Sequence, residues 1–150
     1  MSFDAIAPHY RWLEWVTAGS LLQRCRTAFL HELTDARHVL LLGEGRGRFL
    51  VELLRVNPSA RFTCLDASAR MLDHMRREVR RRRLPDSRLT FLKADVLADI
   101  AGVIGEQGPF DVVASHFFLD CFQPDQLQRV VAEVGKGVSP GGRWVLSDFR

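Results

Sequence analysis

The chain has 150 residues, of which 47% are hydrophobic and 26% are charged, a composition typical of one globular domain with its own core. Its longest unbroken apolar run has only four residues, Val39 to Leu42, which excludes a membrane-spanning helix, and the N-terminus lacks the layout of a signal peptide, so we expect a cytoplasmic protein. The formal net charge of +3 is unevenly distributed, because six arginines and one glutamate lie between Arg76 and Arg83 and the remainder is net negative.

The order of apolar and amphipathic segments predicts the fold class. A helical region is expected from Trp12 to Leu33. Five short apolar runs typical of buried parallel strands follow: His38 to Leu42, Arg61 to Leu65, Leu89 to Leu92, Phe110 to Ser115 and Arg143 to Asp148. Four stretches between them predict helices: Gly47 to Val56, Ser68 to Arg83, Val96 to Ile104 and Pro124 to Gly135. This alternation predicts a doubly wound, mostly parallel α/β sheet over residues 37–150, preceded by a helical extension or lid over residues 1–36.

The spacing of cysteines and histidines indicates neither a disulfide framework nor a metal site. Cys25, Cys64 and Cys121 form no CxxC pair and are odd in number, so we expect them to be small buried hydrophobic residues. The five histidines also lie at no ligand-like spacing, and we therefore expect no metal.

A glycine-rich turn follows the first predicted strand. In Gly43-Glu44-Gly45-Arg46-Gly47, glycines permit a tight turn and close approach to a ligand, and the next helix begins directly afterwards. The spacing is GxGxG and not the GxGxxG of dinucleotide sites, which disfavours a pyrophosphate ligand. By itself, the pattern could also be a turn that simply needs small residues.

Acidic residues follow the next two predicted strands. Asp66 ends the second strand, where a carboxylate can accept hydrogen bonds from the hydroxyl groups of an adenosine ribose. Asp95 follows the third strand at the same edge of the sheet, where it could meet an adenine amino group. Either acid alone could be an ordinary helix cap, as could Ser68. Together with the glycine turn, the two acids predict an adenosyl ligand.

At this point the sequence resembles the class I S-adenosylmethionine-dependent methyltransferases over nearly its whole length. Val39 to Gly47 is similar to the first motif of that family, Asp66 to its ribose-binding acid and Ala94-Asp95-Val96 to its adenine-contacting motif. Phe110 to Ser115 resembles the fourth strand of the family, and Ser139 to Leu146 resembles its turn and fifth strand. The segment Phe3 to Tyr10 is similar to the quinone-biosynthesis-like branch, in which a tyrosine lies over the cofactor.

The resemblance implies a Rossmann-like fold, S-adenosyl-L-methionine as cofactor and methyl transfer as the reaction. The cofactor-binding residues that it implies are Tyr10, Gly43, Glu44, Gly45, Gly47, Asp66, Ala67, Asp95, Val96 and Ser115. For Tyr10 an ordinary place on an amphipathic helix is the alternative.

The sequence departs from the family pattern at two points. The family usually has an acid two residues before the first glycine, where this chain has Leu41; Glu44 is the candidate substitute, although it could equally face solvent. The family also adds a helix and a hairpin after its fifth strand, and this chain ends at Arg150. We therefore expect either a truncated chain or a fifth-strand edge that is covered by a second copy.

Methyl transfer needs alignment more than a catalytic dyad, because the cofactor already holds an activated group. If the acceptor must lose a proton, His116 and Asp120 after the fourth strand are the candidate bases, with structural roles as the alternative. Phe117, Phe118 and Phe122 could line an apolar acceptor pocket or belong to the core. We expect a small-molecule acceptor.

Three other functions remain open from the sequence. A nicotinamide-dependent oxidoreductase could use a similar sheet, although the GxGxG spacing argues against it. A catalytically inert cofactor-binding or scaffold domain would need no acceptor site. Nucleic-acid modification through the arginine cluster is less expected, because those arginines fall in the last turns of a helix and no aromatic residues lie among them.

Overall fold

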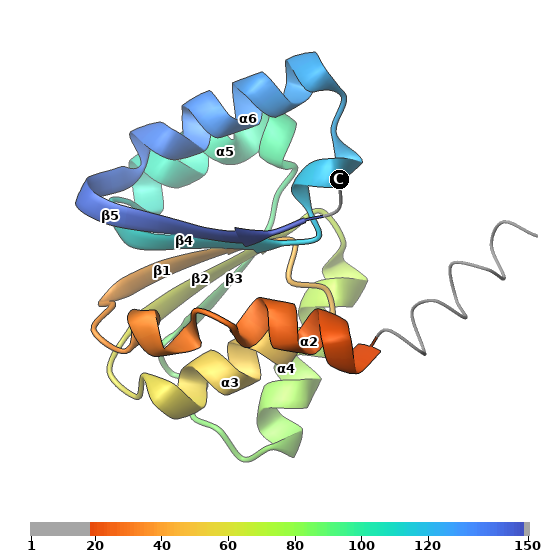
Figure 1. Cartoon of the computed structure of the whole chain (residues 1–150), viewed down its shortest axis with the longest axis vertical. Coiled ribbons are helices and arrows are strands. Elements are labelled where there is room, and N and C mark those ends of the chain that lie inside the picture. The colour runs from red at the N-terminus through yellow and green to blue at the C-terminus, as the bar shows by residue number, and fades with distance from the viewer. Residues whose placement is uncertain (1–18, 149–150) are drawn as a thin grey trace, which may run out of the picture.

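The structure of the protein is a computed structural model that describes residues 19–148 (Figure 1). Its elements follow one another as α2 (Gly19–Thr27), the 3-10 helix η2 (Leu30–Leu33), β1 (His38–Leu42), α3 (Arg48–Val56), β2 (Arg61–Asp66), α4 (Ala69–Arg81), β3 (Leu89–Lys93), α5 (Val96–Gln107), β4 (Phe110–His116), the 3-10 helix η3 (Leu119–Cys121), α6 (Pro124–Lys136) and β5 (Val138–Ser147). Tyr10 and the first part of the predicted helical region lie outside the described residues.

The five strands form one parallel sheet in the order β3-β2-β1-β4-β5. Helices α2, α3 and α4 lie on one side of this sheet, and α5 and α6 lie on the other (Figure 1). The strand order reverses between β1 and β4, which is the point where open α/β sheets bind ligands. The predicted doubly wound fold is confirmed.

Strand β1 explains why the apolar run at Val39 to Leu42 is unbroken. Neighbouring strand residues point to opposite faces, so Val39 and Leu41 belong to the core beneath α3 and α4, while Leu40 and Leu42 belong to the core beneath α5 and α6. All four side chains are fully buried. Because both faces are covered by helices, a central strand has no solvent-facing side and needs no polar residue.

Local signals set most helix boundaries. The Ser68 hydroxyl accepts a hydrogen bond from the Met71 N–H and caps α4, and the Asp95 carboxylate caps α5 by accepting from the Leu97 N–H. The helix predicted over Val96 to Ile104, with Gly105 as its stop, is longer in the structure, since α5 continues through Gly105 to Gln107 and has Gly108 as its C-cap. A single glycine costs a helix only about 1 kcal/mol, which the packing of its apolar side can offset.

The fifth strand also differs from its prediction. It was expected from Arg143 to Asp148, but β5 spans Val138–Ser147. Val138 pairs with Phe110 and Arg143 pairs with Val112, so the residues between them bulge out of register. The turn expected at the start of the segment Ser139 to Leu146 is this bulge, which includes Gly141 at φ 78°. Strand β5 is hydrogen-bonded only to β4 and forms an edge of the sheet.

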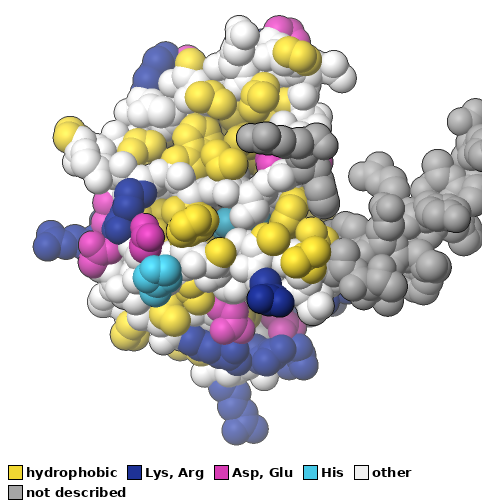
Figure 2. Space-filling model, viewed as in Figure 1, with side chains coloured by type: hydrophobic (Ala, Val, Ile, Leu, Met, Phe, Trp, Pro, Cys, Tyr) yellow, Lys and Arg dark blue, Asp and Glu magenta, His cyan; other side chains and the backbone are white. Residues whose placement is uncertain are grey.

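The arginine cluster lies at the C-terminal end of α4, where it was predicted. Arg81 and Arg82 both donate to the Glu78 carboxylate, with N···O distances of 2.7 and 3.0 Å. Figure 2 shows Lys and Arg side chains gathered over the lower part of this face, where α3 and α4 lie, with acidic side chains among them. The cluster is therefore partly neutralised by its own helix.

Two other observations bear on the sequence expectations. Cys64 is buried, but Cys25 and Cys121 are exposed, so the expectation of three buried cysteines was wrong for these two. Within residues 19–148, no helix is long and apolar enough to cross a membrane.

Candidate functional site

The turn between β1 and α3 is built from glycines in the left-handed region. Gly43, Gly45 and Gly47 have φ values of 62°, 61° and 76°, which side-chain-bearing residues rarely adopt. At Gly43 a Cβ atom would lie 2.1 Å from the Phe118 ring, so glycine is also required by this close approach. Gly47 is the N-cap of α3. The turn thus brings the N-terminus of α3 to the carboxyl edge of the sheet.

A pocket of about 370 Å³ opens beside this turn, at the ends of β1 and β4. It is lined by Arg26, Gly43, Glu44, Gly45, Arg46, Arg48, Met71, His116 and Phe117. The structure therefore brings four of the predicted site residues, Gly43, Glu44, Gly45 and His116, to one cavity.

Glu44 is buried and does not face solvent. Only 7% of its surface is exposed, and its carboxylate accepts hydrogen bonds from the backbone N–H groups of Phe49 and Leu50 at the start of α3. Burial raises the pKa of Glu44 to about 7, although the Arg26 guanidinium and the two N–H groups oppose this shift. Its Oε2 atom has no hydrogen-bond partner among the described residues.

His116 ends β4 and is 3% exposed. Neither ring nitrogen has a hydrogen-bond partner within residues 19–148, and the ring packs edge-on against Phe49 at a centroid distance of 4.5 Å. Burial, together with the smaller effect of the nearby Arg26 charge, lowers the pKa of His116 to about 4, so the imidazole is neutral at neutral pH. Buried polar groups with no partner are rare in proteins, so this imidazole is a candidate to contact a ligand.

Asp66 and Asp95 lie at the same edge, on the ends of neighbouring strands. Asp66 is half-buried, which raises its pKa, and its Oδ1 atom accepts a hydrogen bond from the Ser68 N–H at 2.8 Å. Asp95 is exposed and accepts from the Leu97 N–H at 2.8 Å. Both acids have the local turn or cap role that the sequence left open, and neither role uses all the acceptor capacity of a carboxylate.

Several predicted residues do not line this pocket. The Ser115 hydroxyl is buried and accepts a hydrogen bond from the Trp144 Nε1–H at 2.9 Å. Asp120 is exposed on η3. Ala67 and Val96 follow Asp66 and Asp95 at the strand ends and are also absent from the lining.

The sequence interpretation missed the basic residues of the pocket. Arg26 reaches it from α2, with its guanidinium carbon 4.9 Å from the centre of the Phe117 ring. No local pattern marks Arg26, because it lies far from the glycine turn along the chain. Arg46 lies in the glycine turn and Arg48 directly follows it. In the sequence these positions served only to distinguish a GxGxG spacing from a GxGxxG spacing.

Comparison with known proteins gives a family and a fold. A family model described as a methyltransferase domain matches residues 39–142. No curated protein sequence matches the chain significantly.

Among similar solved structures, an O-methyltransferase family protein from Burkholderia thailandensis has a TM-score of 0.70 at 23% identity, over 87% of this chain and 37% of that chain. The S-adenosylmethionine-dependent methyltransferase SibL has a TM-score of 0.65 at 27% identity, over 77% of this chain and 32% of that chain. The N-methyltransferase NodS from Bradyrhizobium japonicum WM9, in complex with S-adenosyl-L-homocysteine, has a TM-score of 0.65 at 19% identity, over 85% and 58%. This chain thus spans between a third and three-fifths of the length of these structures.

Proposed function

We propose that this chain, which belongs to the family of methyltransferase domains, binds S-adenosylmethionine at the carboxyl edge of its sheet and transfers a methyl group to a small-molecule acceptor. The observation that supports this most is that Glu44 and His116 are both buried, line one pocket, and leave Glu44 Oε2 and both His116 ring nitrogens without a partner among the described residues. The resemblance to class I methyltransferases is confirmed for family and fold. The quinone-biosynthesis-like branch stays a prediction, and none of the three structures described above is an oxidoreductase.

The residues at this edge fit an adenosyl amino acid. The free Oε2 of Glu44 suits an ammonium group, so Glu44 is the proposed substitute for the acid that Leu41 replaces. The remaining acceptor sites of Asp66 suit ribose hydroxyls, and Asp95 is placed for an adenine amino group. At Gly45 a Cβ atom would meet nothing within 4 Å, so open space lies beside the turn backbone. The roles of Ala67, Val96, Ser115 and Tyr10 stay predictions.

The bound cofactor supplies a methyl group that is already activated on a sulfonium, so the protein must align the acceptor and exclude water. His116 is neutral and has free ring nitrogens, which allows it to accept a hydrogen bond from a hydroxyl or amine acceptor. Because its pKa is lowered to about 4, it orients the acceptor better than it stores a proton. Asp120 stays a candidate base that is exposed in this structure.

The lining of the pocket supports a small, partly apolar acceptor. Besides the glycine turn and Glu44, which are assigned to the cofactor, the phenyl ring of Phe117 and the thioether of Met71 give the cavity an apolar side. A cytoplasmic location and association of two copies through the β5 edge also stay predictions. Light scattering after size-exclusion chromatography would test the association, and a monomer would contradict it.

Calorimetry with S-adenosylhomocysteine tests the cofactor assignment. We expect binding to the full chain, and we expect Asp66→Ala to weaken it by about tenfold or more, because a charged hydrogen bond is lost. Asp73→Ala is the matched control, since Asp73 is an exposed carboxylate on α4 that pairs only with Arg76 in the described ion pairs. No binding at millimolar ligand, or equal affinity in Asp66→Ala and the wild type, would contradict the proposal.

A further inference from the structure

The proposed site has an excess of positive charge. Arg26, Arg46 and Arg48 line the pocket, and among the described residues Glu44 is the only carboxylate in its lining. Burial lowers the pKa of Arg26, Glu44 opposes this shift and Arg48 adds to it, so the two guanidinium groups repel each other across the pocket. S-adenosylmethionine itself has a net positive charge and would increase this excess.

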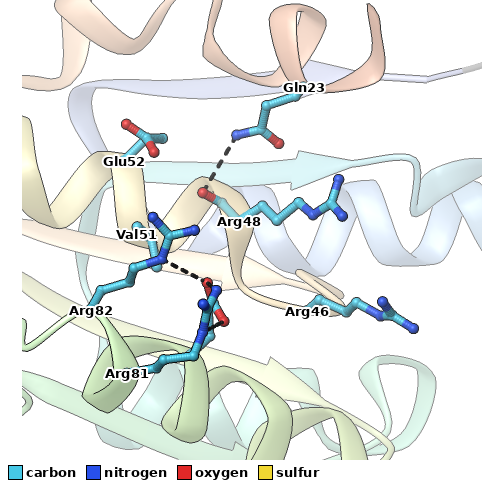
Figure 3. Close-up of a pocket in the computed structure, with 8 residues that line it drawn as sticks. Gln23, Arg46, Arg48, Val51, Glu52, Arg81 and Arg82 are labelled. Atoms are coloured by element: carbon cyan, nitrogen blue, oxygen red, sulfur yellow. Dashed lines mark hydrogen bonds and ion pairs between the residues drawn. The ribbon is translucent and has the colours of Figure 1, made fainter. Parts of the chain in front are cut away.

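Arg46 and Arg48 are also free to bind a ligand. Both are exposed, and within residues 19–148 neither guanidinium group makes a hydrogen bond or an ion pair. Arg81 and Arg82 differ, because both are held by Glu78. Figure 3 shows this contrast: the side chains of Arg46 and Arg48 extend in the same direction, while Arg81 and Arg82 turn to their common partner.

A second cavity adjoins the first at these two arginines. It has a volume of about 400 Å³ and lies between α2, α3 and α4, where Arg46, Arg48, Arg81 and Arg82 outnumber Glu52 and Glu78 (Figure 3). Arg46 and Arg48 line both cavities. A ligand group held between them would have its remaining atoms in the pocket of His116 and Phe117.

We propose that the methyl acceptor is a small organic anion whose carboxylate or phosphate group is held by Arg46 and Arg48, where the two cavities meet. This inference rests on the proposed function and adds the substrate class to it. A guanidinium group presents a planar pair of N–H donors that matches an oxyanion, and two of them together favour an anion over a neutral acceptor. The anion also offsets the charge that the three arginines and the cofactor accumulate.

The experiment is a nuclear magnetic resonance titration of the full chain, with and without saturating S-adenosylhomocysteine. The probes are 4-hydroxybenzoate, phenyl phosphate and 4-hydroxybenzamide, which has the ring and hydroxyl of the first probe but no charge. We expect the charged probes to shift the signals of Arg46, Arg48 and Phe117, and to bind about tenfold more tightly than the amide. The stronger of the two charged probes shows whether the acceptor is a carboxylate or a phosphate.

Two variants test the assignment to these arginines. The double variant Arg46→Gln with Arg48→Gln should lose about tenfold in affinity for the charged probes while keeping its fold. Arg129→Gln, an exposed arginine on α6 across the sheet, should change none of these. Equal binding of the amide, or unaltered affinity for the charged probes in the double variant, overturns the proposal.

The outcomes also separate this proposal from the function on which it rests. Charged probes that bind through Arg46 and Arg48 to a chain that does not bind S-adenosylhomocysteine would support the anion site and refute the methyltransferase function. Binding of S-adenosylhomocysteine with no response to either charged probe would overturn the anion site alone.

Discussion

At the amino end of the strands, Asn57 is fully buried and its whole side chain is hydrogen-bonded, whereas at the carboxyl end Glu44 and His116 are buried with unpartnered atoms. The Asn57 Nδ2 group donates to the Leu33 and Ala36 carbonyls at 2.9 and 2.8 Å. Its Oδ1 atom accepts from the Ser59 and Ala60 N–H groups at 3.2 and 3.0 Å. This side chain therefore ties the end of α3 to two loops.

Asp111 also links two segments at the amino end of the strands. Its two carboxylate oxygens accept hydrogen bonds from the Arg37 and His38 N–H groups at 2.6 and 2.7 Å, which fixes the start of β1 beside β4. Burying a polar group costs free energy unless it finds a partner. The amino end meets this cost with the protein's own groups, while the carboxyl end leaves atoms for which a ligand is the natural partner.

The largest loss of stability is expected when the hydrogen bonds of Asn57, at the amino end of the strands, are removed. Asn57→Ala should lower the free energy of unfolding by about 4 kcal/mol, because it leaves buried carbonyl and N–H groups without partners. Denaturant unfolding measures this loss, and Ser59→Ala, which removes only the hydroxyl that donates to Asn57 Oδ1 at 3.2 Å and keeps the other hydrogen bonds of Asn57, should cost much less. The folded fraction of Asn57→Ala should still bind S-adenosylhomocysteine. A loss below about 1 kcal/mol would mean that the network contributes little.

At the carboxyl end of the strands, the buried groups Glu44 and His116 should each make the free energy of unfolding depend on pH. Glu44 has a folded pKa of about 7, above its ordinary 4.5, so its contribution favours folding at low pH and is lost as the pH rises through that interval. His116 has a folded pKa of about 4, below its ordinary 6.5, so its contribution is present at higher pH and is lost as the pH falls. The two contributions oppose each other and should nearly cancel in the wild type.

Single variants separate the two groups. Between about pH 4.5 and 7, the stability of Glu44→Gln should rise by about 2 to 3 kcal/mol relative to the wild type. The reason is that the stability gained from His116 as the pH rises is no longer cancelled by the stability lost from Glu44. The stability of His116→Gln should fall by a similar amount over the same interval. Denaturant midpoints at several pH values measure both, and parallel profiles for the three proteins would contradict the burial of these groups.

The smallest effect compares two glycines of the same turn. Gly43 and Gly45 have nearly equal φ values of 62° and 61°, so an alanine costs about the same backbone strain at either position. Only at Gly43 would the new Cβ meet the Phe118 ring. Gly43→Ala should therefore be about 1 kcal/mol less stable than Gly45→Ala. This difference should vanish when both are made in a Phe118→Ala background, and its persistence there would contradict the proposed contact.

Much of this arrangement could be predicted from the sequence, because local signals determine it. The apolar run of β1, the glycine turn and the caps Ser68 and Asp95 all lie within a few residues of the structure that they form. The bulge in β5 depends on pairing with β4, and the buried position of Glu44 depends on α2 and α3. Arg26 joins the site only through packing between segments far apart in the chain, so no local pattern could show it.

The central claim is that the carboxyl end of the sheet binds the cofactor, and amide chemical shifts during a titration with S-adenosylhomocysteine test it most directly. We expect the largest shifts at Gly43 to Arg48, at Asp66 to Ser68 and at His116, with the signals of Asn57 and Asp111 unmoved. Shifts concentrated around Asn57 and Asp111, or no shifts at millimolar ligand, would contradict the account.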